Sequence, residues 1–366
     1  MKRFTFPMVL ACCVVVPPMA RAAENAPVDL ETFGRTVDKA VAYLQGAQAP
    51  DGSYAPQMGP GVTAVVASGI LRHGRSPDDP AVAKSLEYLK GFVQPDGGIY
   101  RAGTFYRNYE TSLALMCFVE ANHDGRYDEL IANADRFLRG LQWAGDDESD
   151  PAYGGAGYGR HKRPDLSNTS FLIDALRAAG AGPDDPAIQK ALVFVSRCQN
   201  LESEHNTTPF PAKNPDGGFY YTPAAGGSSQ AGETPEGGLR SYASMTYAGL
   251  KSMIYAGVKP DDPRIQAALE WIRNHYQLDT NPGMGLAGLY YYYHVFAKAL
   301  DAAGIDTFED AQGVEHDWRQ DLLRELVNKQ RPDGSWINEE IRWMEGEPSL
   351  VTGYALLALA YVRPAP

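Results

Sequence analysis

The residues best suited to acid–base chemistry lie in one short segment, GLYYYYHVFAKAL at 288–300. In a helix, Tyr290, Tyr293 and His294 are three or four positions apart, so the spacing predicts that they share one face. Four consecutive tyrosines, Tyr292 among them, predict a polar or wet cavity, because each buried phenol needs a hydrogen-bond partner. A tyrosine and a histidine that face such a cavity can act as acid and base. The alternative is an aromatic core in which the histidine is structural.

Further polar side chains stand near the expected starts of other apolar helices. Arg240 could neutralise a carboxylate while a tyrosine or histidine moves the proton, as in lyases that cleave acidic sugars. Glu110 is another acid–base candidate, although a negative charge in the first turn of a helix is favourable without any function. We predict the following catalytic residues: Tyr293, His294, Arg240 and Glu110. We predict the following cavity or ligand-binding residues: Tyr109, Asp174, Tyr242, Tyr247, Tyr290, Tyr292 and Trp343.

Two segments imitate metal sites. Residues 146–150, DDESD, match the Asp-Asp-x-x-Asp pattern that binds magnesium and diphosphate, but they stand in a loop before Pro151, which favours a solvated acidic turn. A calcium loop counted from Glu120 is excluded, because Ile131 stands where a bidentate acid is required. We therefore predict neither a metal nor a cofactor.

A repeated sequence motif, which we call the phrase, predicts the helices that must position these residues. A glutamine or asparagine near Pro-Asp-Gly is followed by a small residue and an aromatic, at 48–54, 94–100, 214–220 and 330–336. Degenerate copies start at Gln142 and Gln277. A period of a few tens of residues is typical of a stacked-repeat architecture.

Each repeat predicts two helices. An amphipathic helix precedes the phrase, at 37–45, 81–90, 133–142, 187–199, 264–276 and 322–330. A second helix, apolar on nearly all sides, follows it and opens with a hydroxyl in most copies: Thr63, Thr111, Thr169, Thr246 and Thr352. A helix that is apolar all round is buried, so the second helices should form an inner ring and the first helices an outer ring. Six such pairs predict an all-α fold, an (α/α)6 toroid of twelve main helices.

The phrase Gln-x-Pro-Asp-Gly-Ser-Trp after an outer helix resembles the repeat of prenyltransferases and squalene cyclases, over residues 36–362. The resemblance implies a toroid like that of the terpenoid cyclases and the prenyltransferase β subunits, which hold an isoprenoid in an aromatic-lined hollow. The Asp-x-Asp-Asp acid of the cyclases does not occur in this sequence, and neither does the Asp-x-Cys zinc pair of the prenyltransferases.

The chain divides into three parts. Residues 1–22 predict a signal peptide, with Lys2 and Arg3, an apolar run at 8–16 and an A-x-A cleavage site. Residues 30–366 predict a single toroid domain. Within repeat four, residues 200–238 form a long insertion rich in Gly, Pro and Ser, either a lid over one end of the barrel or a surface excursion.

The formal net charge of -12 on 366 residues argues against nucleic-acid binding. We expect an exported, periplasmic or extracellular monomer without a transmembrane segment in the mature chain, which binds a small molecule or a glycan. Three functions remain open. The first is a terpenoid-cyclase-like protein that binds or converts an isoprenoid-like molecule, the second is a secreted polysaccharide lyase, and the third is a non-catalytic binding scaffold.

Overall fold

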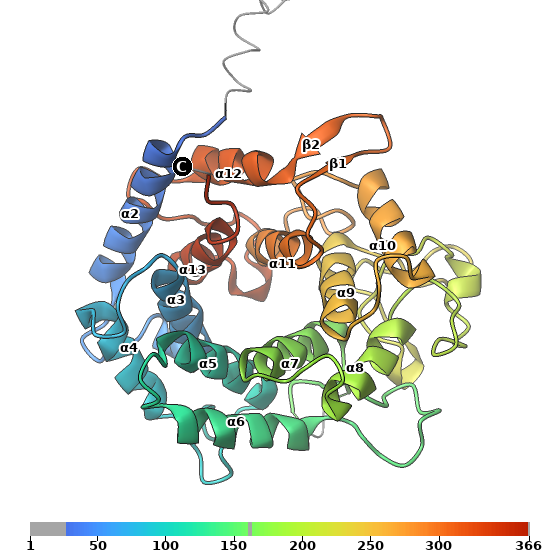
Figure 1. Cartoon of the computed structure of the whole chain (residues 1–366), viewed down its shortest axis with the longest axis horizontal. Coiled ribbons are helices and arrows are strands. Elements are labelled where there is room, and N and C mark those ends of the chain that lie inside the picture. The colour runs from blue at the N-terminus through green and yellow to red at the C-terminus, as the bar shows by residue number, and fades with distance from the viewer. Residues whose placement is uncertain (1–26, 160–162, 365–366) are drawn as a thin grey trace, which may run out of the picture.

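The computed structural model describes residues 27–159 and 163–364, so the expected signal peptide at 1–22 lies outside the described residues. The described chain forms two concentric rings of helices around one axis (Figure 1). The outer ring consists of α2 (Leu30–Ala47), α4 (Pro80–Lys90), α6 (Asp128–Leu141), α8 (Pro186–Arg197), α10 (Pro263–Asn274) and α12 (Trp318–Lys329). The inner ring consists of α3 (Pro60–Arg72), α5 (Arg107–Ala121), α7 (Leu166–Ala178), α9 (Ala243–Tyr255), α11 (Leu289–Ala302) and α13 (Pro348–Leu359). The predicted all-α (α/α)6 toroid is confirmed.

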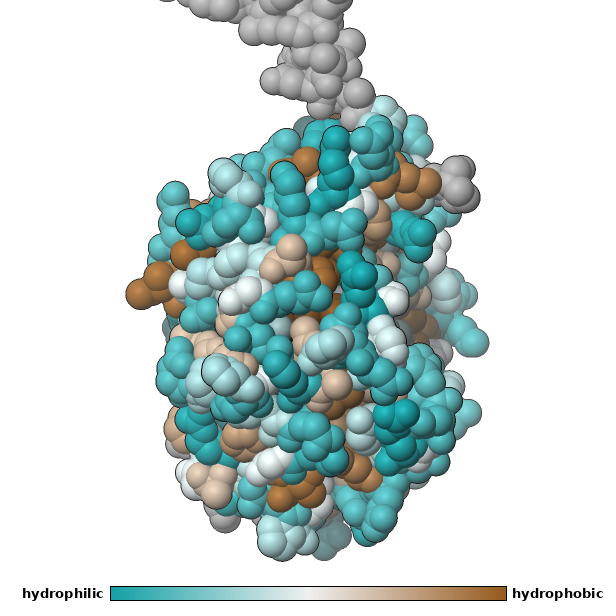
Figure 2. All heavy atoms as spheres, turned by 90° about the vertical axis from the view of Figure 1, so that its left-hand side faces the viewer, coloured by the Kyte–Doolittle hydropathy of each residue, from teal (hydrophilic) through white to brown (hydrophobic). Residues whose placement is uncertain are grey.

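Burial explains why the two kinds of helix occupy different rings. In α13, every residue from Ser349 to Leu359 is buried, whereas α6 buries only Ala134, Leu138 and Leu141. Figure 2, which views the molecule from the side of α2 and α4, shows a mainly hydrophilic surface with scattered apolar side chains. The amphipathic helices therefore face water on one side, while the apolar helices are enclosed.

In four of the six copies, the glutamine of the repeated turn fixes one repeat to the next. The side-chain amide of Gln48 donates to the backbone oxygen of Ala81 in the first turn of the next outer helix, at 2.7 Å. Gln142 and Gln199 make the same link to the following outer helices, at 2.8 Å each. Gln330 donates to the backbone oxygen of Thr36 at 2.9 Å, which joins the last repeat to the first. The same type of glutamine hydrogen bond that links successive repeats therefore also closes the toroid.

A glycine in the turn allows this close approach. Gly334 has φ of +91°, and a Cβ at this position would collide with the backbone oxygen of Lys39 in α2. Gly217 faces Ala267 of α10 in the same way, at 2.9 Å. The predicted hydroxyls complete the motif, because Thr352 accepts a hydrogen bond from the backbone N–H of Trp336 at 3.2 Å. The other four predicted threonines accept the equivalent bond.

Irregular segments connect the helices. A hairpin of β1 (Thr307–Glu309) and β2 (Glu315–Asp317) precedes α12. The single-turn helices are η1 (Pro56–Met58), η2 (Pro211–Lys213), η3 (Ala224–Gly226) and η4 (Arg342–Met344). The segment between α8 and α9 contains η2 and η3 and includes the insertion at 200–238. Along residues 27–159 and 163–364, no helix is both long and apolar enough to cross a membrane.

Candidate functional site

The described inner helices all begin at one end of the barrel, which we call the mouth. In the first turns of α5 and α7, the Asn108 side chain donates to the backbone oxygen of Asn168 at 3.0 Å. In the last turns of α3 and α5, Arg72 lies 2.6 Å from Glu120 at the opposite end. The helices therefore run parallel, and the loops that precede them gather side chains from distant parts of the sequence at the mouth.

Four aromatic side chains, which we call the aromatic ring, surround the axis near the mouth. The ring centroid of Phe171 in α7 lies 5.1 Å from that of Tyr109 in α5 and 5.9 Å from that of Tyr291 in α11. Tyr291 is 6.1 Å from Tyr354 in α13. The hydroxyls of Tyr109 and Tyr354 are 3.1 Å apart, which closes the set. Because α3 packs between α5 and α13, this last hydrogen bond bridges helices that are not neighbours.

A buried group of charges, the axial cluster, lies about one helical turn further from the mouth. The Nζ atoms of Lys251 and Lys298 are 2.6 and 2.9 Å from the same Asp174 oxygen. Burial alone would raise the pKa of Asp174, but the two ammonium groups outweigh it and hold this pKa at about 2. Burial lowers the pKa of Lys251 to about 8. His294 completes the cluster, and burial together with the charge of Lys298 lowers its pKa well below the usual value.

Exposed aromatic side chains flank the mouth on two loops. Phe105 and Tyr106, just before α5, are 51% and 38% exposed, and their ring centroids are 4.2 Å apart. Trp343 in η4 is 41% exposed and faces Gly288, where a Cβ would lie 3.0 Å from its ring.

The backbone that presents Trp343 is strained. Trp343 and Met344 have φ of +57° and +68°, in the left-handed region that residues other than glycine rarely adopt. Strain of this kind is retained where the surrounding structure holds a side chain in a functional orientation. Glu345 supplies part of that hold, because its carboxylate accepts the backbone N–H of Tyr291 at 2.8 Å.

Five arginines stand on the loops at the mouth or at the start of its helices: Arg101, Arg107, Arg163, Arg240 and Arg342. Within the described part of the chain, none of them forms an ion pair with a carboxylate. Arg163 donates to the hydroxyl of Ser228 at 3.0 Å, and Arg342 donates to the side-chain oxygen of Gln230 at 2.6 Å. Arg107 lies over the ring of Tyr100 at 5.1 Å. Among the described residues, these arginines therefore have no carboxylate in direct contact, although the charge of Arg101 acts on Glu110 and that of Arg163 acts on Asp165 over a longer distance.

Three carboxylates at the mouth are buried. Burial raises the pKa of Glu110 to about 7, although its carboxylate accepts the backbone N–H of Arg101 at 2.8 Å. Burial likewise raises the pKa of Asp165, the N-cap of α7, to about 6, and it raises the pKa of Glu345. The pKa of Glu110 thus lies near neutral pH, so this group can exchange a proton there.

The tyrosines of α11 divide between two sides of the helix. The hydroxyls of Tyr292 and Tyr293 donate to backbone oxygens of the loop before α11, at 2.8 and 2.5 Å. Tyr293 also approaches Glu325 of the outer helix α12 at 3.3 Å, and Tyr290 packs against Tyr293. His294 instead stacks near Tyr354 of the aromatic ring. The predicted shared face of Tyr293 and His294 is incorrect, because adjacent helical residues point about 100° apart.

The other predicted residues are also separated. Tyr109 belongs to the aromatic ring and Asp174 to the axial cluster, while Glu110 and Trp343 lie at the mouth. Two further residues are buried: Tyr242, just before α9, and Tyr247, which packs against Tyr292 and Phe296. Arg240 donates to the backbone oxygen of Glu233 at 2.9 Å, so it is held on the mouth loops while Tyr293 faces the outer ring. The catalytic and ligand-binding roles of all these residues stay predictions.

Sequence reasoning missed several residues at the centre. Tyr291 and Lys298, which were not predicted, point toward the axis together with the predicted His294, at spacings of three and four along α11. Lys251 is a lone charge in an otherwise apolar helix, and this signal could have paired it with Asp174. Tyr354 carried no comparable signal, because its partner is 245 residues away in the sequence.

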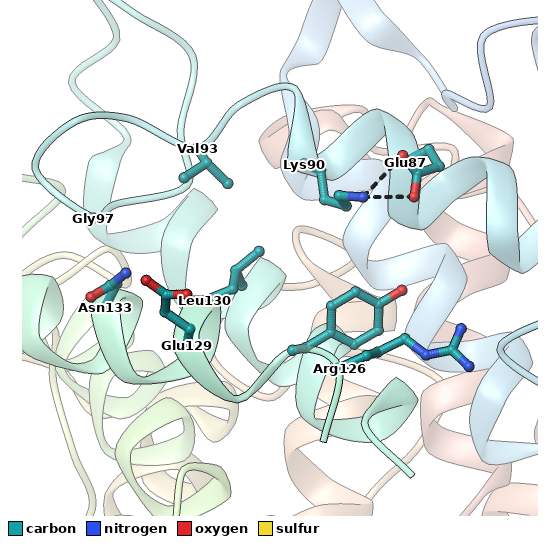
Figure 3. A pocket seen from close by; sticks show the side chains of 9 residues that line it. Glu87, Lys90, Val93, Gly97, Arg126, Glu129, Leu130 and Asn133 are labelled. Carbon is teal, nitrogen blue, oxygen red and sulfur yellow. Dashed lines mark hydrogen bonds and ion pairs between the residues drawn. The ribbon is translucent and has the colours of Figure 1, made fainter. Parts of the chain in front are cut away.

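A groove in the outer ring lies between α4 and α6 (Figure 3). Its lining carries both signs of charge, and Lys90 is paired with Glu87 at 2.9 Å. Such self-neutralised, solvent-facing charges do not mark this groove as a site. Among residues 27–159 and 163–364, no group of three His, Cys, Asp or Glu side chains is placed to hold a metal ion.

Solved structures of the same architecture include several enzymes. A type II terpene cyclase, MstE from Scytonema, with geranylgeranyl dihydroxybenzoate bound as substrate, matches with a TM-score of 0.53 and 15% identity, over 92% of this chain and 98% of that chain. A polysaccharide lyase matches with a TM-score of 0.53 and 11% identity, over 90% and 96%. A glycosyl hydrolase of family 88 from Bacteroides vulgatus matches with a TM-score of 0.54 and 9% identity, over 91% and 99%.

No family model and no curated protein sequence matches this chain. The structural likeness therefore shows the fold, an α/α toroid shared by terpene cyclases and by enzymes that act on glycans.

Proposed function

We propose that this protein binds an acidic polysaccharide across the mouth of its inner ring. The observation that carries the proposal is the set of mouth arginines without a described carboxylate partner, on a chain whose net charge is -12. Acidic side chains are abundant in this chain, so unpaired guanidinium groups gathered at one end call for another explanation. A planar guanidinium binds a carboxylate or sulfate through two parallel hydrogen bonds.

The exposed aromatic side chains fit the same ligand. Phe105, Tyr106 and Trp343 offer flat apolar faces beside the charged groups, and a sugar ring has both apolar faces and polar edges. Arg342 lies 4.3 Å from the ring centroid of Trp343, so a cation and an aromatic face are presented together.

Acid–base groups near the mouth would support cleavage of the bound chain. In an elimination, a base takes the proton next to the sugar carboxylate, the bond to the leaving oxygen breaks, and an acid protonates that oxygen. A mouth arginine would stabilise the charge on the carboxylate. Among the described residues near the mouth, the candidates for the proton transfers are Glu110 and the pair of Tyr109 and Tyr354. Export, suggested by the N-terminal sequence, and the shared fold of a polysaccharide lyase both support this proposal.

The test compares binding of polygalacturonate with binding of an uncharged galactan, by isothermal titration of the purified protein. Polygalacturonate should bind more tightly, its affinity should fall with salt, and Arg240→Ala combined with Arg342→Ala should weaken it at least about tenfold, or 1.4 kcal/mol. Arg75→Ala with Arg126→Ala, which removes two arginines of the outer surface, is the matched control. Equal affinity for the neutral glycan, or an equal loss in the control, would refute the proposal.

A second candidate is an isoprenoid-like ligand, which the aromatic ring favours. Tyr109, Phe171, Tyr291 and Tyr354 are the kind of side chains that line an apolar ligand site. Such a ligand would have to separate the Tyr109–Tyr354 hydrogen bond and approach the charged axial cluster, which argues for the glycan instead. Native mass spectrometry of the protein as purified separates the two, because a retained lipid mass would support the isoprenoid.

A further inference from the structure

The axial cluster and its surroundings carry an uneven charge. The charged groups that act on His294 and Lys298 are three cations, Arg72, Lys251 and Lys298 itself, and the anion Asp174. Arg72 has its own partner in Glu120, at 2.6 Å. Asp174 must therefore serve both lysines, and one positive charge among the described axial groups is left without a counter-charge.

Among the described residues, Asp174 Oδ1 and His294 Nδ1 are buried polar atoms of the cluster without a hydrogen-bond partner. Buried polar atoms are normally satisfied, and of these two only the imidazole nitrogen can donate a hydrogen bond, so His294 is the one that points to a bound acceptor. His294 and Lys298 keep 7% and 8% of their surfaces accessible, although inner helices enclose both. Neither residue is therefore completely enclosed by the surrounding helices.

The surplus charge is unlike that of an ordinary buried ion pair. An unpaired cation out of water is costly, and it is stabilised either by losing its proton or by gaining an anion. Burial disfavours the charge of Lys298, but the attraction of Asp174 outweighs it and raises its pKa. Neutral His294 can donate through Nδ1, so an anion next to it would find one ammonium group and one N–H donor.

We propose that a small monovalent anion of the size of chloride binds beside His294 and Lys298 on the barrel axis. The site is independent of the glycan site at the mouth. The hydrogen bond between Tyr109 and Tyr354 joins α5 to α13 between the mouth and the cluster, so the cluster lies deeper in the barrel than the groups proposed to meet the polysaccharide.

The first test measures thermal unfolding at constant ionic strength while chloride replaces gluconate, an anion too bulky for the site. Once chloride exceeds its dissociation constant, the melting temperature should rise with the logarithm of the chloride concentration, by about 2–4 °C for each tenfold increase. Lys298→Met removes the surplus charge and should abolish the rise. Lys84→Met, an exposed lysine of α4, is the matched control and should keep it. Lys251→Met replaces Lys298→Met if the latter does not fold.

The second test locates the anion. Crystals grown in bromide should show an anomalous peak within hydrogen-bond distance of the Lys298 ammonium group and His294 Nδ1. A melting temperature that is independent of chloride, an undiminished chloride effect in Lys298→Met, or bromide bound only at the surface would each overturn the proposal.

Discussion

Most arginines of the outer-ring helices differ from those of the mouth in having a carboxylate partner. Arg139 of α6 lies 2.8 Å from Asp135 in its own helix and 2.8 Å from Asp185 at the start of α8, so it ties two repeats together. Arg264 of α10 lies 2.7 Å from Asp262. Among the described residues, Arg342 at the mouth has two uncharged side-chain partners, Gln230 and the ring of Trp343. The same residue type thus supports the scaffold in one region and remains available to a ligand in the other.

The repeated turns and the mouth also differ in backbone strain. In the repeated turns, the left-handed positions are occupied by glycine, as at Gly52, Gly97, Gly217 and Gly334, so no strain is stored there. At the mouth, Trp343 and Met344 adopt left-handed conformations despite their large side chains. The repeated turns thus carry no left-handed strain, whereas the mouth does. This is the pattern expected when the turns stabilise the fold and the mouth binds a ligand.

The largest expected effect concerns the turns. In Gly154→Ala, the new Cβ would collide with the backbone oxygen of Lys190 in α8, and φ is +82°. We expect a loss on the order of 3 kcal/mol or more in the free energy of unfolding, because the turn must move away from α8. Urea denaturation followed by circular dichroism measures it.

The control for this prediction is Gly180→Ala. Gly180 has φ of +100°, but a Cβ there would meet nothing within 4 Å. Only backbone strain is added, so the loss should be about 1 kcal/mol. Equal losses in the two variants would show that close helix approach at the turn is not what restricts this position to glycine.

The repeated turns could be predicted from the sequence, whereas much of the centre of the barrel could not. The turns were predictable because their chemistry is local: Pro-Asp-Gly ends a helix, and Thr352 binds Trp336 only 16 positions earlier. Six copies of one signal then implied the closed double ring. The centre was less predictable because its contacts join distant segments, as Tyr109 does with Tyr354, and because one residue of helical phase decides whether a tyrosine of α11 faces the axis or α12.

The next prediction contrasts a mouth carboxylate with a turn carboxylate. The pKa of Glu110 is raised from 4.5 to about 7, so this group stabilises the fold below its unfolded pKa and loses that contribution as pH rises through 7. Glu110→Gln keeps an oxygen for the Arg101 N–H. The variant should match wild type near pH 4 and be more stable by about 1–3 kcal/mol at pH 8. Thermal melts across this range test it.

Asp333→Asn provides the opposite sign. Hydrogen bonds from Ser335 lower the pKa of Asp333, so its contribution is present above the unfolded pKa and disappears as pH falls through the folded one. The variant should therefore lose stability near neutral pH and approach wild type in acid. If Glu110→Gln showed this same profile, Glu110 would be an ordinary ionised carboxylate in the fold.

The smallest effect tests the arginine comparison itself. Arg139→Ala removes one ion pair within α6 and one that bridges α6 and α8, and because the side chain is partly exposed, the loss should be only about 0.5–1 kcal/mol. Arg342→Ala should change stability by less than about 0.5 kcal/mol, since its hydrogen bond to Gln230 is exposed. The two variants should exchange rank in polygalacturonate binding, which only Arg342→Ala weakens. Urea denaturation and titration on the same preparations measure both quantities, and a mouth variant that lost more stability than Arg139→Ala would make Arg342 part of the scaffold.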